Sequence, residues 1–368
     1  MHEIELKFGL PASQLDALRA ELARLGADIA RPQILQAAYF DTPDRRLAQA
    51  RAALRVRRED DDWVQTFKSA GLNTMVRVED NQPATPPAAS ADGEALRPDL
   101  SRHGEAARQV LIQALGWQPE RDPPGHHSGL VALYRTDMRR TRARLTVAAG
   151  TPHEGMVELA LDEGAILAGE GPQQRCEAVC ELEIELLSGS PQAVILAAEA
   201  WVTRFGLWLD TQTKAHRGDR LARQVLPMTA RPATPPAEPT TPARAVPPTP
   251  AAPRDGEHTA TAAWPVALEA ALGPYTRAMS ALASASGDVT ADTGASWEAA
   301  TRNLLTVARQ EAAQPWAHDL AAQAEALAQR IAALHLDQPD QPETLTALAR
   351  SADATRMALA VFTVLLTV

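Results

Sequence analysis

Short segments in which charged and apolar residues alternate are the feature that most restricts the fold of this chain. In the first, residues 2–9, Glu3, Glu5 and Lys7 alternate with apolar residues. Successive side chains of a β-strand point to opposite faces, so this period predicts strands with one charged and one apolar face. The pattern returns at Arg55 and Arg57, Arg77 and Glu79, Arg140, Arg142 and Arg144, Glu158 and Asp162, and Glu181, Glu183 and Glu185. Many such strands with few helices predict a closed barrel or a sandwich.

The first 225 residues are expected to consist mostly of strands. Expected strands lie at 2–9, 36–41, 52–59, 62–69, 74–80, 130–137, 138–148, 155–162 and 177–187, with a short one at 207–212. Helices are expected at 14–25, 105–115 and 191–205. The first of them has a capping box at Ser13 and Asp16 and stops at Gly26.

A proline-rich segment divides the chain. Proline fixes φ and removes an amide donor, so residues 226–262 are expected to form an extended spacer. Beyond it, alanine and leucine recur at helical spacing, which predicts helices at 263–284, 294–313, 315–335 and 342–366. The chain is therefore expected to contain a strand-rich domain (1–225), a linker (226–262) and a helical domain (263–368).

Composition excludes several classes of partner. The net charge of −10 leaves no broad basic surface, so no nucleic-acid partner is expected. The longest apolar run, MALAVFTVLLTV, is shorter than the ~20 residues that cross a bilayer, and no apolar signal region opens the chain. We therefore expect a cytoplasmic protein with no membrane partner. Cys176 and Cys180 do not have metal-site spacing and are expected to be reduced thiols.

The charged faces are sorted into acidic and basic strands. On a single strand such a face is usually solvated, but six of them together predict a barrel with a charged interior. Carboxylates bind Mg²⁺ or Mn²⁺, and arginine or lysine binds phosphate oxygens, so this interior suits a polyphosphate carrying metal ions. The three lysines of the chain, Lys7, Lys68 and Lys214, all lie in such segments. Lysine binds a phosphate oxygen as a compact point charge.

Residues 1–220 resemble the CYTH superfamily, the triphosphate tunnel metalloenzymes. The diagnostic ExExK motif is met by Glu3, Glu5 and Lys7. Further matches follow in order: YFDTP at 39–43, LRVR at 54–57, TFK at 66–68, RVE at 77–79, RTR at 140–142, ELALD at 158–162, ELEIELLSG at 181–189 and TKAHRG at 213–218. The likeness is strongest to bacterial inorganic triphosphatases that carry a C-terminal CHAD-like helical domain.

The resemblance implies an α+β fold, a closed eight-stranded antiparallel β-barrel with flanking helices, followed by an all-α helical bundle. It also implies hydrolysis of inorganic triphosphate to pyrophosphate and phosphate, dependent on Mg²⁺ or Mn²⁺, with tripolyphosphate as the substrate partner. The carboxylates expected on the metal side are Glu3, Glu5, Glu79, Asp162, Glu183 and Glu185, the last two as direct ligands. The residues expected to bind phosphate are Lys7, Arg55, Arg57, Lys68, Arg77, Arg140, Arg142, Lys214 and Arg217.

Catalytic roles are expected for Glu5, Lys7 and Glu183, and the carboxylate that orients the attacking water stays open between Glu5 and Glu183. Glu158 and Glu181 are expected either to join the metal side or to serve as charge partners of the arginines. Family members often have lysine at the position of Arg140, so the phosphate contact there is expected to differ.

Other functions also fit the pattern. A class IV adenylate cyclase or a thiamine triphosphatase would need a pocket for an organic ring, and few aromatic residues lie near the motifs. A polyphosphate-binding module would not need so many carboxylates facing inward. Residues 263–368 hold six arginines, no lysine and eleven acids. They are therefore expected to form a short or degenerate CHAD-like domain that mediates protein contacts or oligomerisation.

Overall fold

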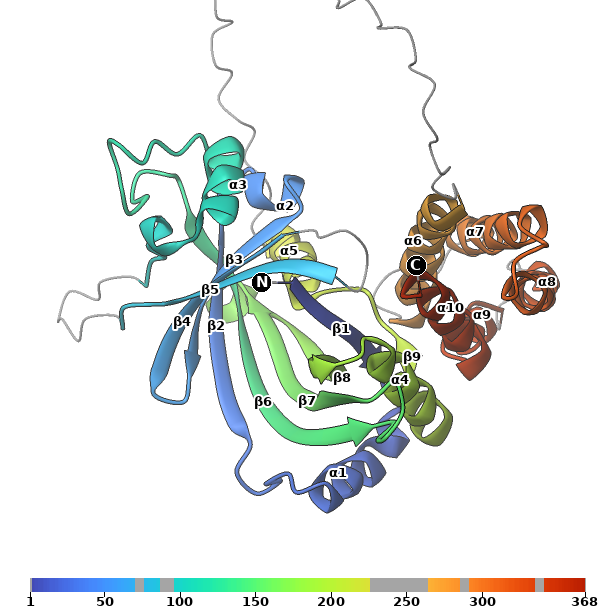
Figure 1. Cartoon of the computed structure of the whole chain (residues 1–368). Coiled ribbons are helices and arrows are strands. Elements are labelled where there is room, and N and C mark those ends of the chain that lie inside the picture. The colour runs from blue at the N-terminus through green and yellow to red at the C-terminus, as the bar shows by residue number, and fades with distance from the viewer. Residues whose placement is uncertain are drawn as a thin grey trace, which may run out of the picture.

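The computed structural model describes residues 2–69, 76–86, 96–225, 264–284, 291–334 and 341–367. A strongly curved antiparallel sheet with flanking helices is followed by a bundle of helices (Figure 1). The predicted linker, residues 226–262, lies outside the described residues, and the predicted division into domains stays a prediction. No helix in the described ranges is both long and apolar enough to cross a membrane.

Nine strands form one sheet in the order β5-β4-β3-β2-β6-β7-β8-β1-β9, and neighbouring strands are antiparallel. Their bounds are β1 (His2–Gly9), β2 (Gln33–Asp41), β3 (Ala52–Glu59), β4 (Asp62–Ser69), β5 (Val76–Pro83), β6 (Val131–Val147), β7 (Gly155–Ala168), β8 (Arg175–Gly189) and β9 (Trp208–Leu209).

The expected closed eight-stranded barrel is corrected in two respects. The sheet has nine strands, because β9 adds beside β1 at Phe8 and Gly9. In addition, within the described residues β1 pairs with β5 at three positions, from His2 to Ile4, whereas Glu5 to Gly9 pair with β8. Backbone pairing therefore joins the two ends of the strand series over a short contact and does not close the sheet along the full length of β1 and β5.

Some element bounds also differ from the sequence predictions. The strands expected at 130–137 and 138–148 are one strand, β6, of 17 residues. No glycine or proline interrupts this stretch, so pairing with β7 continues from Tyr134 to Val147. The helix expected at 342–366 is two helices, because the Ser351 side chain accepts a hydrogen bond from the Ala354 amide and begins a new helix.

Ten α-helices lie in the described residues. They are α1 (Leu15–Arg24), α2 (Arg46–Gln49), α3 (Glu105–Leu115), α4 (Gln192–Phe205), α5 (Lys214–Val225), α6 (Trp264–Ala283), α7 (Ala291–Gln310), α8 (Ala317–Ala332), α9 (Gln341–Ala349) and α10 (Ala352–Leu365). Helices α2 and α5 were not predicted from the sequence. The capping box expected at Ser13 and Asp16 is wrong, because the residue before α1 is Gln14 and its side chain makes no capping hydrogen bond. Helices α3 and α4 end where Gly116 and Gly206 adopt positive φ.

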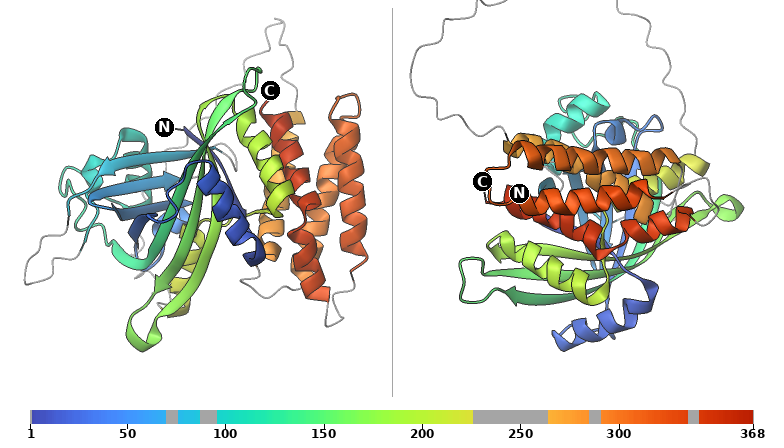
Figure 2. Two further views of the ribbon diagram at one scale, coloured as in Figure 1. Left: turned by 90° about the horizontal axis from the view of Figure 1, so that it is seen from below. Right: turned by 90° about the vertical axis from the view of Figure 1, so that its right-hand side faces the viewer.

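The apolar faces of the central strands point outward, onto helices. Leu6 of β1, Leu159 of β7 and Ile184 of β8 are buried in a core that includes Val194 and Ala198 of α4. That core continues into the helical region, where α10 packs against α4 (Figure 2). Burial of this apolar surface stabilises the sheet from outside. The alternating charged faces of the same strands are therefore left on the inside of the curve.

Candidate active site

One cavity of about 1520 Å³ is enclosed by the curved sheet. Strands β1–β8 all contribute residues to its wall, together with residues of α2, α5, α6 and α7. The predicted site residues that line it are Glu5, Lys7, Arg55, Arg57, Lys68, Glu79, Arg140, Arg142, Asp162, Glu183, Glu185 and Lys214. The structure thus brings most of the predicted residues into one space.

Three of the predicted residues are not placed in this wall. The side chains of Glu3 and Arg77 lie outside the described part of the structure. Arg217 does not line the cavity, because its guanidinium donates to Glu177 Oε1 at 2.7 Å and to the Ala178 carbonyl at 2.7 Å. It reaches the cavity wall only through Glu181, at 3.5 Å.

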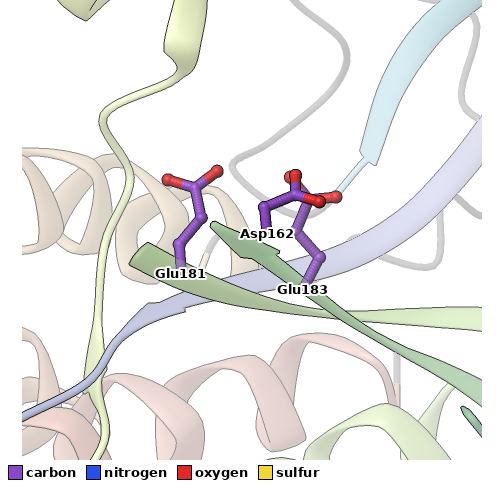
Figure 3. Close-up of side chains that lie close together, drawn as sticks. All are labelled: Asp162, Glu181 and Glu183. Carbon is purple, nitrogen blue, oxygen red and sulfur yellow. The ribbon is translucent and has the colours of Figure 1, made fainter. Parts of the chain in front are cut away.

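A buried cluster of carboxylates lies on the neighbouring strands β7 and β8. Oxygens of Asp162, Glu181 and Glu183 lie within 4.8 Å of one another (Figure 3). Lys214 Nζ reaches all three, at 2.6 Å from Asp162, 2.5 Å from Glu181 and 2.9 Å from Glu183. Burial alone would lower the pKa of Lys214, but these carboxylates outweigh it and raise that pKa well above its usual range.

Arg140 and Lys7 complete the charge balance of this cluster. Arg140 donates to both oxygens of Asp162 at 2.6 Å and to Glu183 at 2.5 Å, a forked contact that lysine could not reproduce. Lys7 Nζ lies 3.0 Å from Glu181. Burial raises the pKa of Glu183, but Arg140 and Lys214 outweigh it and hold that pKa well below its usual range. Each carboxylate of this cluster therefore has at least one direct cationic partner.

A second row of carboxylates crosses β1, β8 and β7. Glu185 of β8 lies in the middle of this row. The register places Glu5 of β1 opposite it on one side and Glu158 of β7 opposite it on the other side. Glu158 is bound by Arg142 at 3.3 Å, whereas none of the described ion pairs includes Glu185. The pKa of Glu185 is raised by burial and then by the nearby charges of Glu5 and Glu158. Glu185 thus lies between two other carboxylates, and it is the member of this row that none of the described ion pairs includes.

Arginines of β3 face the same space. Arg55 and Arg57 are two residues apart on one strand and therefore share a face. Burial, followed by repulsion from Arg55, lowers the pKa of Arg57 to about 10. Arg55 Nε is buried with no hydrogen-bond partner in the part of the chain that is described. A buried guanidinium nitrogen with no acceptor indicates a place for an anionic ligand. Beside them, Lys68 pairs with Glu79 at 2.7 Å.

The sequence analysis missed two residues of the site, Asp210 and Gln212. Lys7 Nζ donates to Asp210 Oδ2 at 3.1 Å and to the Gln212 carbonyl at 2.5 Å. Both residues lie in the loop between β9 and α5, which has no period-two pattern. The available signal was a single acid at the end of the expected strand, four residues before Lys214.

A close contact between α5 and β6 positions Lys214 at the start of α5. A Cβ at Gly218 would lie 2.1 Å from the ring of Tyr134, so glycine is needed for the helix to approach. Tyr134 also donates a hydrogen bond to the Ala215 carbonyl at 3.0 Å. The ring of Tyr134 stacks on Tyr39, with centroids 4.8 Å apart.

Comparisons with known proteins show what this chain is similar to. The inorganic triphosphatase of Haemophilus influenzae is 27% identical over 223 residues, which cover 59% of this chain and 54% of that protein. The chain therefore spans about half the length of this curated relative. Among solved structures, HpAC1 of Hippeastrum, described with a dominant triphosphatase activity, aligns with a TM-score of 0.33 and 21% identity over 56% of this chain and 89% of its own.

Another solved structure, the PH1819 protein of Pyrococcus horikoshii OT3, aligns with a TM-score of 0.30 and 19% identity over 55% of this chain and 88% of its own. The family model of the CYTH domain matches residues 1–218. The helical region lies beyond this match, and its likeness to CHAD domains stays a prediction. Since the match covers more than half of the chain, the protein belongs to the CYTH domain family.

Proposed function

We propose that this protein hydrolyses inorganic triphosphate to pyrophosphate and phosphate in the cavity enclosed by the sheet. The observation that carries the proposal is that one cavity wall combines buried arginines and lysines with a row of three adjacent carboxylates, Glu5, Glu185 and Glu158. Phosphate binding alone would require only the cations. Membership of the CYTH family and the Haemophilus influenzae relative support a triphosphatase-type reaction.

The carboxylates fit a divalent cation such as Mg²⁺ or Mn²⁺, which prefers oxygen ligands. The cluster of Asp162, Glu181 and Glu183 already has direct cationic partners. We therefore assign the metal to Glu185, which none of the described ion pairs includes, together with Glu5 opposite it. Glu183 is adjacent to this pair, opposite Lys7. A bound metal would neutralise phosphate oxygens and lower the pKa of a bound water.

The basic residues would bind and polarise the substrate. Arg55 and Arg57 would hold the oxygens of the terminal phosphoryl group, since Arg55 Nε has no acceptor within the described residues. Lys7, Arg140 and Lys214 would stabilise the negative charge that develops on the bridging oxygen as pyrophosphate leaves. Their positive charge is held at the cavity wall by carboxylates before substrate arrives, so little reorganisation is needed.

The water that attacks the terminal phosphorus must give up a proton. Glu183 is a poor acceptor, because Arg140 and Lys214 hold its pKa well below the usual range. We therefore propose that Glu5 and Glu185 orient the water and that one of these two carboxylates would accept its proton. The new bond joins the water oxygen to the terminal phosphorus, and the bond from that phosphorus to the bridging oxygen breaks.

The aromatic residues of the cavity favour a substrate without an organic ring. Within the described wall of the cavity they are Tyr39, Phe40 and Tyr134. Tyr39 and Tyr134 stack on each other with 18° between their planes, so each covers a face of the other ring. An adenylate cyclase or a thiamine triphosphatase would need such a face for its base or thiazole.

The proposal is tested by initial rates of phosphate release from tripolyphosphate, ATP and thiamine triphosphate, each with Mg²⁺, Mn²⁺ or EDTA. We expect metal-dependent release, with kcat/KM for tripolyphosphate about tenfold or more above the other two, a difference of about 1.4 kcal/mol in barrier. Preference for a nucleotide or a thiamine ester would assign a different substrate to the same cavity. No release from any of them would favour a polyphosphate-binding module.

A further inference from the structure

We infer that Ser280 of α6 is a positioning residue for Lys7 and Lys214, acting through the loop that joins β9 to α5. The role assigned to those lysines rests on the proposed function, but the contacts that hold the loop do not. This loop, residues 210–213, will be called the lysine loop. It lies between the sheet and the helical region, and α6 packs against β9.

The hydroxyl of Ser280 is fully used by the strand and loop that precede α5. Ser280 Oγ accepts hydrogen bonds from the Thr211 amide at 2.8 Å and from Thr211 Oγ1 at 3.0 Å, and donates to the Leu209 carbonyl at 3.3 Å. A serine hydroxyl has one donor and two acceptor sites, so its capacity is complete. Ser280 is wholly buried, which makes each of these bonds costly to lose.

Gln212 connects the helical region to Lys7 directly. Its side-chain Nε2 donates to the Ser280 carbonyl at 3.1 Å and to Ser284 Oγ at 2.5 Å. Its backbone carbonyl accepts from Lys7 Nζ at 2.5 Å. The same residue thus contacts α6 through its side chain and a lysine of the cavity through its main chain.

Of the three acceptors of Lys7 that lie in the described part of the chain, the lysine loop supplies two. Besides Glu181, these are Asp210 Oδ2, at 3.1 Å, and the Gln212 carbonyl. Asp210 Oδ1 in turn accepts from the Gln212 amide at 2.8 Å, which fixes the two acceptors relative to each other. Lys214 follows the loop immediately, so a displacement of the loop would move both ammonium groups away from their carboxylates.

A second helix holds the other side of the same strand. The amide of Leu209 donates to Thr355 Oγ1 of α10 at 3.1 Å. Strand β9 is therefore held by hydroxyls from two helices of the C-terminal region, on either side of Leu209. Through these hydrogen bonds, the helical region would hold the lysine loop in the position where it contacts Lys7 of β1.

The test uses the fact that the chain has three lysines, all in the cavity wall. In the full chain labelled with ¹⁵N-lysine, the side-chain ammonium groups give three signals, which Lys→Arg variants assign. We expect Ser280→Ala to move the signals of Lys7 and Lys214 and to leave that of Lys68 in place. Thr301→Val is the matched control, because among the described residues the buried hydroxyl of Thr301 bonds only to the Trp297 carbonyl of its own helix.

Kinetics provide a second readout on the same variants. Because Lys7 and Lys214 are assigned to the leaving group, Ser280→Ala is expected to lower kcat for tripolyphosphate by about ten- to a hundredfold with little change in KM. Ser284→Ala removes one contact to Gln212 and should shift the Lys7 signal less. Thr301→Val should change neither kcat nor the lysine signals.

Unmoved Lys7 and Lys214 signals in folded Ser280→Ala protein would overturn the inference. If Ser280→Ala does not fold, an unmoved Lys7 signal in Ser284→Ala would do the same. A wild-type protein inactive on tripolyphosphate would overturn the proposed function instead, while the lysine signals would still test the positioning role.

Discussion

Replacing Lys214 with methionine is expected to lower kcat for tripolyphosphate by about 10²–10³-fold and to destabilise the fold by about 3–5 kcal/mol near neutral pH. Lys214 Nζ contacts Asp162, Glu181 and Glu183, and methionine would leave these buried carboxylates with fewer cationic partners. The measurements are steady-state phosphate release and urea unfolding followed by tryptophan fluorescence.

The pH dependence of this destabilisation follows from the pKa of Glu183, which is held well below its usual range in the folded protein. A depressed folded pKa contributes stability above the unfolded value of about 4.3, and this contribution is lost as pH falls through the folded value. The difference in the free energy of unfolding between wild type and variant should therefore be largest near neutral pH and should decrease below about pH 4.

Arg302→Met is the matched control for the loss of a cation from a helix. Arg302 is exposed on α7 and pairs with Glu298 one turn away, so its replacement should change the free energy of unfolding by only a few tenths of a kcal/mol, ~0.5 at most. An equal, small effect of both substitutions would contradict the buried cluster.

Replacing Glu185 with glutamine is expected to remove metal-dependent turnover while the fold stays intact. Glu185 lies between Glu5 and Glu158, and burial together with the charges of these two carboxylates raises its pKa, so folding does not favour its ionised form. Loss of one carboxylate should weaken Mn²⁺ binding by about tenfold or more, measured by calorimetry, and lower kcat at fixed metal concentration.

Glu163→Gln provides the comparison for Glu185→Gln. Glu163 lies on β7 and pairs with Arg19 of α1, outside the cavity wall. Its replacement should leave the Mn²⁺ affinity and the metal dependence of the rate unchanged. If Glu185→Gln behaved in the same way, the metal would have to be assigned to other carboxylates, first of all the cluster of Asp162, Glu181 and Glu183.

Much of the cavity wall could be predicted because the alternation of charge specifies one face of each strand. Once Glu5 and Lys7 share a face, antiparallel pairing places them opposite Glu185 and Glu183, and the charged side chains converge. The pattern does not say where one strand ends and the next begins. That is why β6 was expected as two strands and why the short pairing of β1 with β5 could not be foreseen.

The part of the site that comes from the lysine loop could not be predicted. Asp210 and Gln212 act through a single carboxylate and a backbone carbonyl, and neither leaves a periodic pattern. The surface against which the helical region packs could not be predicted either. Alanine and leucine at helical spacing indicate an apolar face but not its partner, here the outer side of α4.

The most direct test of the proposed reaction is ³¹P NMR of tripolyphosphate incubated with the protein in ¹⁸O-labelled water. With Mg²⁺, we expect pyrophosphate and orthophosphate to appear in equal amounts, with the ¹⁸O-induced shift on the orthophosphate alone, and no change in the presence of EDTA. Label in the pyrophosphate would contradict attack on the terminal phosphorus. A tripolyphosphate spectrum that stays unchanged with Mg²⁺ would contradict the proposed function itself.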